Sequence, residues 1–150
     1  QQVAGGLELG RINIAARGAG MAQGATKMAL HYAMERKTFG KTIAEHQAIQ
    51  LKLAEMSTRA AAAELLVHQA ADKYDRHERC DLEAGQAKFF ASEAAVQNSL
   101  DAMRVFGGYS YSPEYEIERF YRDAPLLCIG EGTNEIQRMI IAKQMIARAS

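Results

Sequence analysis

Apolar residues recur along the chain at the spacing of α-helices. The clearest series alternates intervals of four and three residues over almost four heptads, and it comprises Ile49, Leu53, Met56, Ala60, Ala63, Val67, Ala70 and Tyr74. Residues at this spacing share one face of a helix, as in an antiparallel bundle or a coiled coil. The pattern therefore predicts a helix over residues 44–74 whose apolar face packs against other helices.

A helix over residues 9–35 is predicted to precede it. Its middle is dominated by small residues, namely Ala15, Ala16, Gly18, Ala19, Gly20, Ala22, Gly24 and Ala25. Because glycine weakens a helix by about 1 kcal/mol relative to alanine, its presence here needs a reason. The close approach of a neighbouring helix is such a reason. The glycine spacing does not match a dinucleotide-binding fingerprint, and no strand precedes it.

Two further long helices are predicted in the second half of the chain. One covers residues 81–106, with Asp81 as its N-cap and the pair Gly107-Gly108 ending it. The other is capped by Thr133 or Asn134 and reaches residue 149.

A short helix is predicted between them, over residues 112–122. Ser112 suits its N-cap and Pro113 its first position. The segment 123–125, which ends in proline, is expected to break this helix, and residues 126–132 are expected to form a loop.

These elements predict an all-α protein, an up-and-down four-helix bundle with a short extra helix before the last long helix. Residues 1–112 contain no proline, which permits long helices. Long helices joined by short connections favour antiparallel neighbours. Since no internal repeat or low-complexity linker divides the chain, residues 1–150 are interpreted as one domain.

Composition excludes several classes of function without naming one. The 150 residues are 48% apolar and 24% charged, with 18 basic and 18 acidic side chains. This apolar fraction excludes a disordered chain, and the zero net charge argues against nucleic acid as a partner. No stretch approaches the ~20 apolar residues of a membrane span. Two cysteines are too few for a disulfide scaffold, which favours reduced thiols in the cytoplasm or, in a eukaryote, the mitochondrial matrix.

Familiar metal-binding and nucleophilic patterns are absent from the sequence. A di-iron bundle needs Glu-x-x-His on two helices, and the cysteines form no Cys-x-x-Cys pair. Glu64 and His68 lie four residues apart, a spacing typical of a surface contact. No Gly-x-Ser-x-Gly elbow occurs. We therefore expect no metal site.

Two segments depart from the routine of a helical bundle. Residues 36–41 join basic side chains to a glycine between two helices, and residues 106–111 place two glycines beside aromatic residues. Each segment also has an ordinary explanation, since basic residues suit a helix C-terminus and glycines end helices. Both interpretations remain open when each segment is considered alone.

A third segment, residues 129–136, places Glu131 between two glycines just before a helix N-terminus. The glycines let a ligand approach the backbone, and the helix start offers free N–H groups to an anion. A carboxylate that reaches into an apolar pocket is also a stronger base. The simpler alternative is an acidic residue favoured by the helix dipole.

Together these segments resemble the acyl-CoA dehydrogenase family. The matching motifs follow the family's order and spacing, and they are Arg36-Lys37-Thr38-Phe39-Gly40, His46-Gln47, Gly107-Gly108-Tyr109, Glu118-Arg119, Arg122-Asp123-Ala124 and Glu131-Gly132-Thr133-Asn134-Glu135-Ile136. The resemblance covers essentially the whole chain, but it concerns the C-terminal helical domain alone. The family's N-terminal helical and middle β-domains have no counterpart in residues 1–150, which implies a chain that is inactive by itself.

The resemblance implies an FAD-dependent oxidoreductase that converts an acyl-CoA thioester into a trans-2-enoyl-CoA. One carboxylate takes the α-proton while the β-hydrogen leaves as hydride to the flavin, and by motif position Glu131 is that base. Some relatives place the glutamate on the first helix at the position of Gly10, so the glycine strengthens the assignment to Glu131. The implied partners are an electron-transfer flavoprotein, which reoxidises the flavin, and identical subunits of a homotetramer.

The same resemblance assigns contacts to individual residues. Those expected to face FAD are Arg36, Thr38, Gln47, Arg104, Gly107, Gly108, Thr133 and Glu135, and those near acyl-CoA are Glu8, Arg11 and Gly132. Arg36 and Thr38 are expected to meet the FAD diphosphate from a neighbouring subunit, a task that suits a planar guanidinium. Arg104 stands where many relatives have glutamine. Gly130 replaces a tyrosine or another larger residue, which suggests a roomier pocket for a branched or bulky acyl chain.

Two other functions are alternatives to an acyl-CoA dehydrogenase. One is a non-catalytic helical assembly or binding module that keeps the fold, and the presence of Glu131 argues against it. The other is a relative with altered chemistry, such as an acyl-CoA oxidase or a nitroalkane-oxidising enzyme. Glu131 does not separate dehydrogenase from oxidase, because oxygen reactivity depends on access to the flavin.

Overall fold

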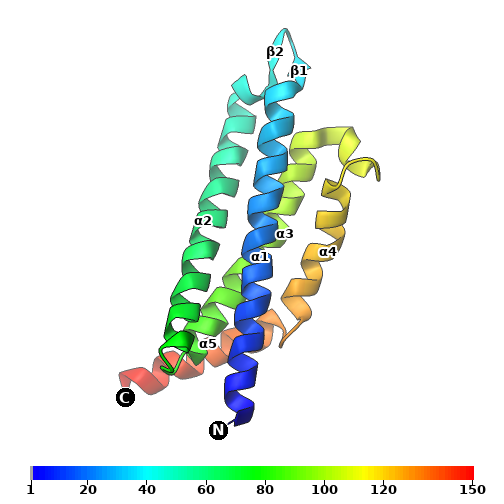
Figure 1. Ribbon diagram of the computed structural model, residues 1–150. Helices are drawn as coiled ribbons and strands as arrows, with labels where there is room; N and C mark the ends of the chain where they lie inside the picture. Colours follow the sequence, from blue (N-terminus) through cyan, green and yellow to red (C-terminus); the bar gives the residue numbers. More distant parts are fainter. Residues whose placement is uncertain (1) are drawn as a thin grey trace.

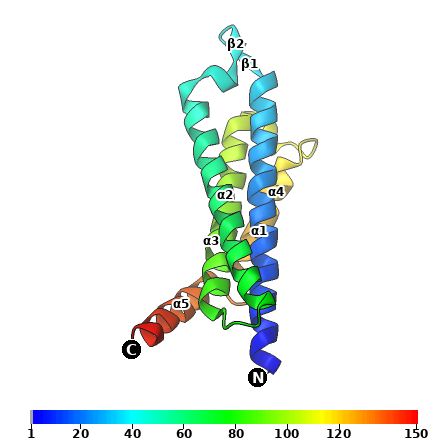
Figure 2. The ribbon, with the colours of Figure 1, turned by 60° about the vertical axis from the view of Figure 1, so that its left-hand side comes forward.

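Helices form nearly all of the structure, a computed structural model that describes residues 2–150, with side chains from residue 6 onward (Figure 1). The helices are Gln2–Glu35 (α1), Gln47–Asp75 (α2), Asp81–Phe106 (α3), Ile117–Ile129 (α4) and Asn134–Ala149 (α5). The first four run along the length of the molecule, and α5 crosses one end and projects sideways (Figure 2). The predicted all-α bundle is confirmed, with the short helix α4 as its fourth member.

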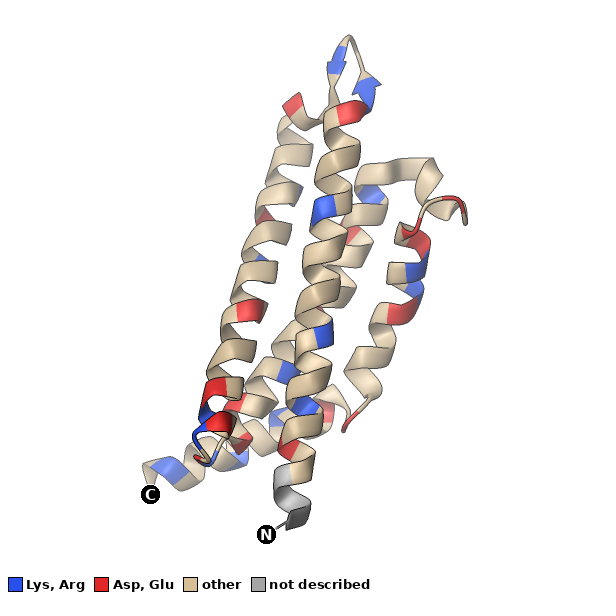
Figure 3. Cartoon of the chain, viewed as in Figure 1, with Lys and Arg blue, Asp and Glu red and all other residues tan. Residues whose placement is uncertain are grey.

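The connections between helices are short. A two-stranded antiparallel hairpin, β1 (Lys37–Thr38) and β2 (Lys41–Thr42), projects from the end of the bundle after α1. A 3-10 turn over Ile43–Glu45 leads into α2, and a second one over Gly107–Tyr111 follows α3. Basic residues are visible on the hairpin strands, whereas the long helices carry scattered charges of both signs (Figure 3).

Small residues bring α1 and α3 into close contact, as predicted. A Cβ atom added at Gly18 would lie 2.7 Å from the carbonyl oxygen of Ala91, and one added at Gly24 would lie 2.9 Å from the Phe120 ring. The buried apolar residues of α1 are Ile12, Ala15, Ala19, Ala22, Ala25, Ala29 and Ala33. The small residues therefore serve packing inside the domain.

The apolar face predicted for the second helix is confirmed. Met56, Ala60, Ala63 and Ala70 are buried between α1, α2 and α3. The remaining members of the series are partly buried against the same core, and they are Ile49, Leu53, Val67 and Tyr74. Helix α2 begins at Gln47 rather than near residue 44, because a capping box between Thr42 and Glu45 holds the preceding turn in 3-10 form.

The prediction for residues 112–132 is wrong in two respects. Ser112 does not start a helix; its hydroxyl accepts a bond from the Glu114 N–H within a turn, and α4 begins later at Ile117. Pro125 does not end the helix; it lies exposed inside α4, which continues to Ile129. The missing proline donor is tolerated because Ala124 and Leu127, on either side of it, are buried against α3 and α1. Packing here outweighs local preference.

Other boundaries shift less. Helix α1 begins at Gln2 rather than near residue 9, since no proline stops it. Cys80, not Asp81, occupies the N-cap of α3, and the Asp81 carboxylate instead accepts a bond from Arg79 at 2.7 Å. The predicted ends at residues 106 and 149 are confirmed, and Thr133 caps α5. Among the described residues, no helix has the length and apolar character of a membrane span.

A buried carboxylate ties α5 to the bundle. Glu83 on α3 accepts two bonds from Arg148 in the last turn of α5, at 2.8 and 3.0 Å, and one from Lys73 of α2 at 2.6 Å. These bonds, with those from Arg148 dominant, lower the pKa of Glu83 from 4.5 to about 2. The ion cluster therefore fixes the far end of α5 against two other helices.

The contact between α1 and α3 predicts opposite effects of two glycine substitutions. Gly18→Ala should lower the free energy of unfolding by about 1–3 kcal/mol, because its Cβ would overlap the α3 backbone. Gly20→Ala, one half-turn away in open space, should raise it by up to ~1 kcal/mol through helix propensity. Urea-induced unfolding measures both. Equal effects would contradict the close approach.

The Glu83 cluster predicts a pH-dependent contribution to stability. Since the folded state lowers the pKa of this carboxyl, the stabilisation is fully present above pH ~4.5 and is lost as the pH falls towards 2. Glu83→Gln should therefore cost roughly 1–3 kcal/mol at pH 6, and the difference from wild type should shrink below pH 4.5. Urea unfolding across this pH range is the measurement, with the exposed Glu55→Gln as control.

Candidate functional site

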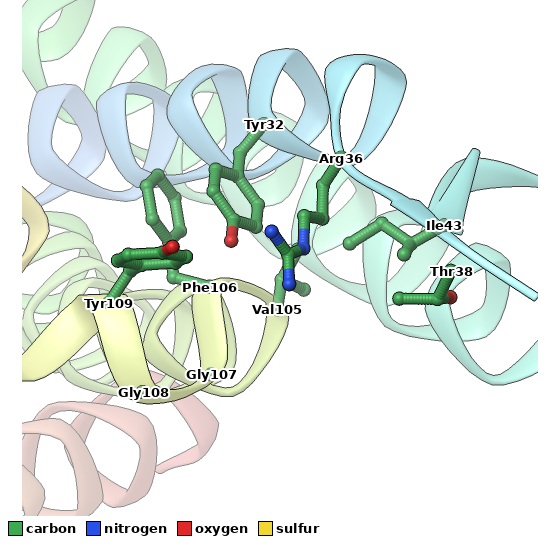
Figure 4. A pocket seen from close by; sticks show the side chains of 9 residues that line it. All are labelled: Tyr32, Arg36, Thr38, Ile43, Val105, Phe106, Gly107, Gly108 and Tyr109. Atoms are coloured by element: carbon green, nitrogen blue, oxygen red, sulfur yellow. The ribbon is translucent and has the colours of Figure 1, made fainter.

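One pocket lies where the hairpin meets the end of α3. It has a volume of about 480 Å³ and is lined by Tyr32, Arg36, Thr38, Ile43, Val105, Phe106, Gly107, Gly108 and Tyr109 (Figure 4). Four of the predicted cofactor residues, Arg36, Thr38, Gly107 and Gly108, thus come together although Arg36 and Gly107 are 71 positions apart in the sequence. The fold brings both basic and glycine-rich segments to one cavity.

The backbone of this pocket is open to a ligand. Gly107 ends α3 with a φ of +63°, a conformation that favours glycine, and a Cβ added at Gly107 or Gly108 would meet nothing within 4 Å. Across the cavity, the Arg36 guanidinium lies 5.6 Å from the centre of the Tyr109 ring. Tyr32 stacks on Phe106 with ring centroids 4.2 Å apart. Exposed amides, one guanidinium and aromatic walls suit a planar ligand that carries phosphate.

The other residues near this end of the bundle differ in how close they lie to the pocket. Thr38 shares a hydrogen bond of 3.0 Å with His46 Nε2, and Gln47 follows as the exposed first residue of α2. Phe39, at the hairpin turn, is 96% exposed with a φ of +53°. Arg104 is exposed and binds Asp101 at 3.1 Å. Gln47 and Arg104 therefore lie near this end of the bundle, but they do not line the pocket.

Glu131 lies at the opposite end of the bundle, in the turn between α4 and α5. Glu131 and Gly132 both adopt left-handed backbone conformations, with φ of +55° and +87°. The Glu131 side chain is exposed and reaches α1 beside Gly10, where an added Cβ would lie 2.6 Å from Oε2. A side chain at position 10 would therefore displace the carboxylate. A strained non-glycine residue of this kind is common at functional sites.

The helix that follows begins with the residues predicted to face the flavin. Thr133 is the N-cap of α5 and accepts a bond from the Ile136 N–H. Glu135, in the first turn, is exposed, and a hydrogen bond to its own backbone N–H lowers its pKa. Both residues adjoin the Glu131 turn, and their contact with a flavin remains a prediction.

Glu8 and Arg11, predicted near the substrate, lie on the same stretch of α1 as Gly10. Burial, together with a hydrogen bond to Asp81, raises the pKa of Glu8, whose carboxylate also accepts a bond from the Cys80 thiol at 3.5 Å. The buried Nε of Arg11 has no hydrogen-bond partner among the described residues. These groups therefore border the Glu131 end of the bundle.

The structure divides the predicted site residues into two groups. Gly10 beside Glu131 and Glu35 beside the pocket are separated by 25 residues of α1, or roughly 38 Å at ~1.5 Å per residue. This separation exceeds the length of an extended dinucleotide. One dinucleotide cannot therefore touch both groups within a single copy of the chain.

Three buried polar residues beneath the Glu131 turn are not among the predicted site residues. Lys88, Asn134 and Gln137 have 0%, 2% and 0% exposure. A signal for Lys88 was available, because it falls on the alanine face of α3 with Ala84, Ala87 and Ala91. In the part of the chain that the structure describes, no cluster of metal-ligating side chains occurs.

Comparisons with known proteins agree on one family. The model of the acyl-CoA dehydrogenase C-terminal domain matches residues 1–146. An acyl-CoA dehydrogenase of Bacillus subtilis is 51% identical, and a 3-(aryl)acrylate reductase of Clostridium sporogenes is 49% identical; each match covers 93% of this chain and 37% of the relative. The solved structure of butyryl-CoA dehydrogenase from Megasphaera elsdenii matches with a TM-score of 0.92 at 39% identity, over 93% of this chain and 37% of that one. The chain thus spans little more than a third of these relatives.

The left-handed conformation of Glu131 predicts an unusual response to glycine. Glu131→Gly should leave the protein about 0.5–1 kcal/mol more stable than Glu131→Ala, because glycine adopts this conformation without strain. At the exposed helical position 55 the order should reverse, with Glu55→Gly less stable than Glu55→Ala by about 1 kcal/mol. Urea unfolding of the four variants tests this, and the same order at both positions would contradict the strain.

Proposed function

Because this chain belongs to the acyl-CoA dehydrogenase family, whose C-terminal domain it matches, we propose that it supplies the catalytic base and part of the FAD site of an α,β-dehydrogenation of acyl-CoA. Residues 1–150 would form the C-terminal domain of that enzyme. The observation that carries the proposal is the Glu131 carboxylate, which is accessible in a strained turn and lies against a position on α1 that has no side chain.

Glu131 is the proposed base for the α-proton of the thioester. A base must lie within hydrogen-bond reach of the proton that it removes, and the vacant space beside Gly10 lets the carboxylate extend over α1. Arg11, whose Nε has no hydrogen-bond partner among the residues that the structure describes, follows Gly10 on α1. Gly132, which is predicted to lie near the substrate, follows Glu131 in the turn, and its lack of a side chain leaves room for the Gln137 amide.

The pocket at the hairpin end fits the proposed cofactor. A bound FAD supplies the acceptor for a hydride equivalent from the β-carbon. Arg36 and Thr38 would hold its diphosphate, and the open backbone of Gly107 and Gly108 would face its adenosine portion. The Arg36 guanidinium is already aimed into this cavity (Figure 4). At the other end, Thr133 and Glu135 would adjoin the flavin.

The two ends of the bundle support a proposed homo-oligomer. Since roughly 38 Å of α1 separates them, an FAD that contacts Glu131 in one copy meets the Arg36 pocket of another copy. A complete cofactor site therefore needs at least two subunits, and the four subunits of a homotetramer would form four such sites. An electron-transfer flavoprotein is the proposed acceptor of the electrons.

Gly130 supports a substrate with a bulky or branched acyl group. It lies beside Ile14, and an added Cβ would approach the Ile14 side chain to 3.7 Å, so a large residue here would fill that space. The aryl substrate in the name of the Clostridium sporogenes relative is compatible with a wide pocket. A strong preference for short straight chains would contradict this proposal.

A second candidate is the reverse reaction, reduction of an α,β-unsaturated acyl group. It is favoured by the name of the same relative, a 3-(aryl)acrylate reductase. Glu131 would then donate a proton to the α-carbon, because a base for one direction is the acid for the other. The direction depends on the redox partner rather than on Glu131.

The base assignment predicts the outcome of one substitution in the full-length protein. Purified wild-type protein should contain flavin whose absorbance bleaches when acyl-CoA is added. Glu131→Gln should retain the flavin but slow bleaching by at least about 100-fold, because the amide cannot accept the proton. Glu55→Gln, on the exposed face of α2, should behave as wild type. Unchanged bleaching in Glu131→Gln excludes this base, and an absence of flavin favours a non-catalytic module.

A further inference from the structure

A buried lysine links the two helices that flank Glu131. Lys88 on α3 has no exposed surface, and its ammonium donates to the Cys128 carbonyl at 3.0 Å and to Asn134 Oδ1 at 2.8 Å. Cys128 lies in the last turn of α4, and Asn134 is the first residue of α5. A single cation thus joins the end of one helix to the start of the next, with the Glu131 turn between them.

Both partners of the ammonium suit it physically. The last carbonyls of a helix lack intrahelical donors and carry the negative end of the helix dipole, so a cation there is favourable. The Asn134 amide is fixed in turn, because its Nδ2 donates to Ser92 Oγ at 3.0 Å and to Glu93 Oε1 at 2.7 Å. Ser92 lies one helical turn beyond Lys88 on α3. The network therefore anchors the Glu131 turn to α3.

A second buried side chain binds the turn itself. Gln137 Nε2 donates to the carbonyl oxygens of Glu131 and Gly132, at 3.1 and 3.2 Å. A Cβ at Gly132 would lie 2.9 Å from this nitrogen, so the amide packs tightly under the turn. Gln137 thus contacts the backbone of the proposed base, whereas Lys88 holds the helices on either side of it.

The arrangement costs stability at two points. Burial of an ammonium is unfavourable, and desolvation lowers the pKa of Lys88. The left-handed conformation of Glu131 costs a further ~1–2 kcal/mol. An apolar residue would pack against the alanines around position 88 without the first cost. Both unfavourable features, the buried ammonium and the strained backbone, occur where the chain places Glu131.

We propose that Lys88 is a positioning residue for Glu131, acting through Cys128 and Asn134, and that Gln137 completes the support from below. The proposal rests on the proposed role of Glu131 as the base. Lys88 itself does not contact the carboxylate; it fixes where the Glu131 backbone lies. Displacement of a reacting group by about 1 Å can slow a reaction by on the order of 100-fold, so this support affects the rate more than binding.

The test uses Lys88→Met in the full-length flavoprotein, because methionine keeps an unbranched side chain only one atom shorter than that of lysine and removes the donors. Flavin reduction at saturating acyl-CoA should slow about 10- to 100-fold. The FAD content and the Kd for acyl-CoA should change less than threefold. Lys143→Met, an exposed substitution on α5, is the matched control and should behave as wild type. An unchanged rate, or an equal loss of FAD and substrate binding, overturns the proposal.

Gln137 provides a second set of variants in case Lys88→Met does not fold. Gln137→Met removes the amide that donates both bonds to the turn and should slow flavin reduction, while Gln137→Glu sets a carboxylate against two carbonyls and should slow it further. The same order is not expected if Gln137 merely fills space, since glutamate matches its shape better than methionine does. Equal rates in wild type and both variants overturn the proposal.

Amide hydrogen exchange separates failure of this proposal from failure of the proposed function. Residues 128–134 should exchange at least about tenfold faster in Lys88→Met than in wild type, and the middle of α2 should not change. If wild type reduces flavin and Glu131→Gln does not, the function stands, and unchanged rate and exchange in Lys88→Met overturn the role of Lys88 alone. If wild type reduces no flavin, the function fails, and the exchange result still decides whether Lys88 orders the turn.

Discussion

The close contact between α1 and α3 is the constraint on which the other features depend. Since Gly18 leaves no room for a side chain against Ala91, the two helix axes approach as far as their backbones allow. Both functional regions are built across this pair. At one end Arg36 follows α1 and Gly107 ends α3, and both residues line the same pocket. At the other end Gly10 on α1 faces Glu131, whose turn is held from α3. A change in the spacing of the two helices would alter both ends at once.

Helix α3 is also the source of the polar interactions that hold its neighbours. Its Asn98 amide donates to backbone carbonyls of Ala22 on α1 and Met56 on α2. Glu83 binds the C-terminal part of α5, and Lys88 joins the end of α4 to the start of α5. Buried polar groups are favourable when their partners are supplied, and each of these is paired. Because alanines form the rest of the buried face, these few polar side chains specify which helix packs where.

Helices that follow from apolar periodicity could be predicted from the sequence. Predictions were wrong where tertiary contacts override the local preference of a residue. The 81–106 helix and the apolar face of α2 follow directly from helical spacing. The break predicted at Pro125 is wrong because α4 continues through this residue, where Ala124 and Leu127 hold the helix by packing into the core. The grouping of Arg36 with Gly107 required the fold, since nothing in either segment identifies the other. The role of Lys88 could not be read from its helix alone, as its partners lie 40 or more residues away.

The surroundings of Glu131 indicate what the domain leaves to other parts of an enzyme. Large apolar side chains are exposed on the two helices that flank the turn, namely Leu126, Ile129, Ile136 and Met139. A carboxylate removes a proton from carbon more readily when water is excluded around it, and neither the turn nor α1 excludes water from Glu131. Under the proposed function, the acyl chain and the rest of the protein would cover these apolar residues and exclude water from the site. Under the same proposal, the 150-residue chain would position the base through Gly10, Gln137 and Lys88, whereas the environment that makes the base effective would come from other parts of the enzyme.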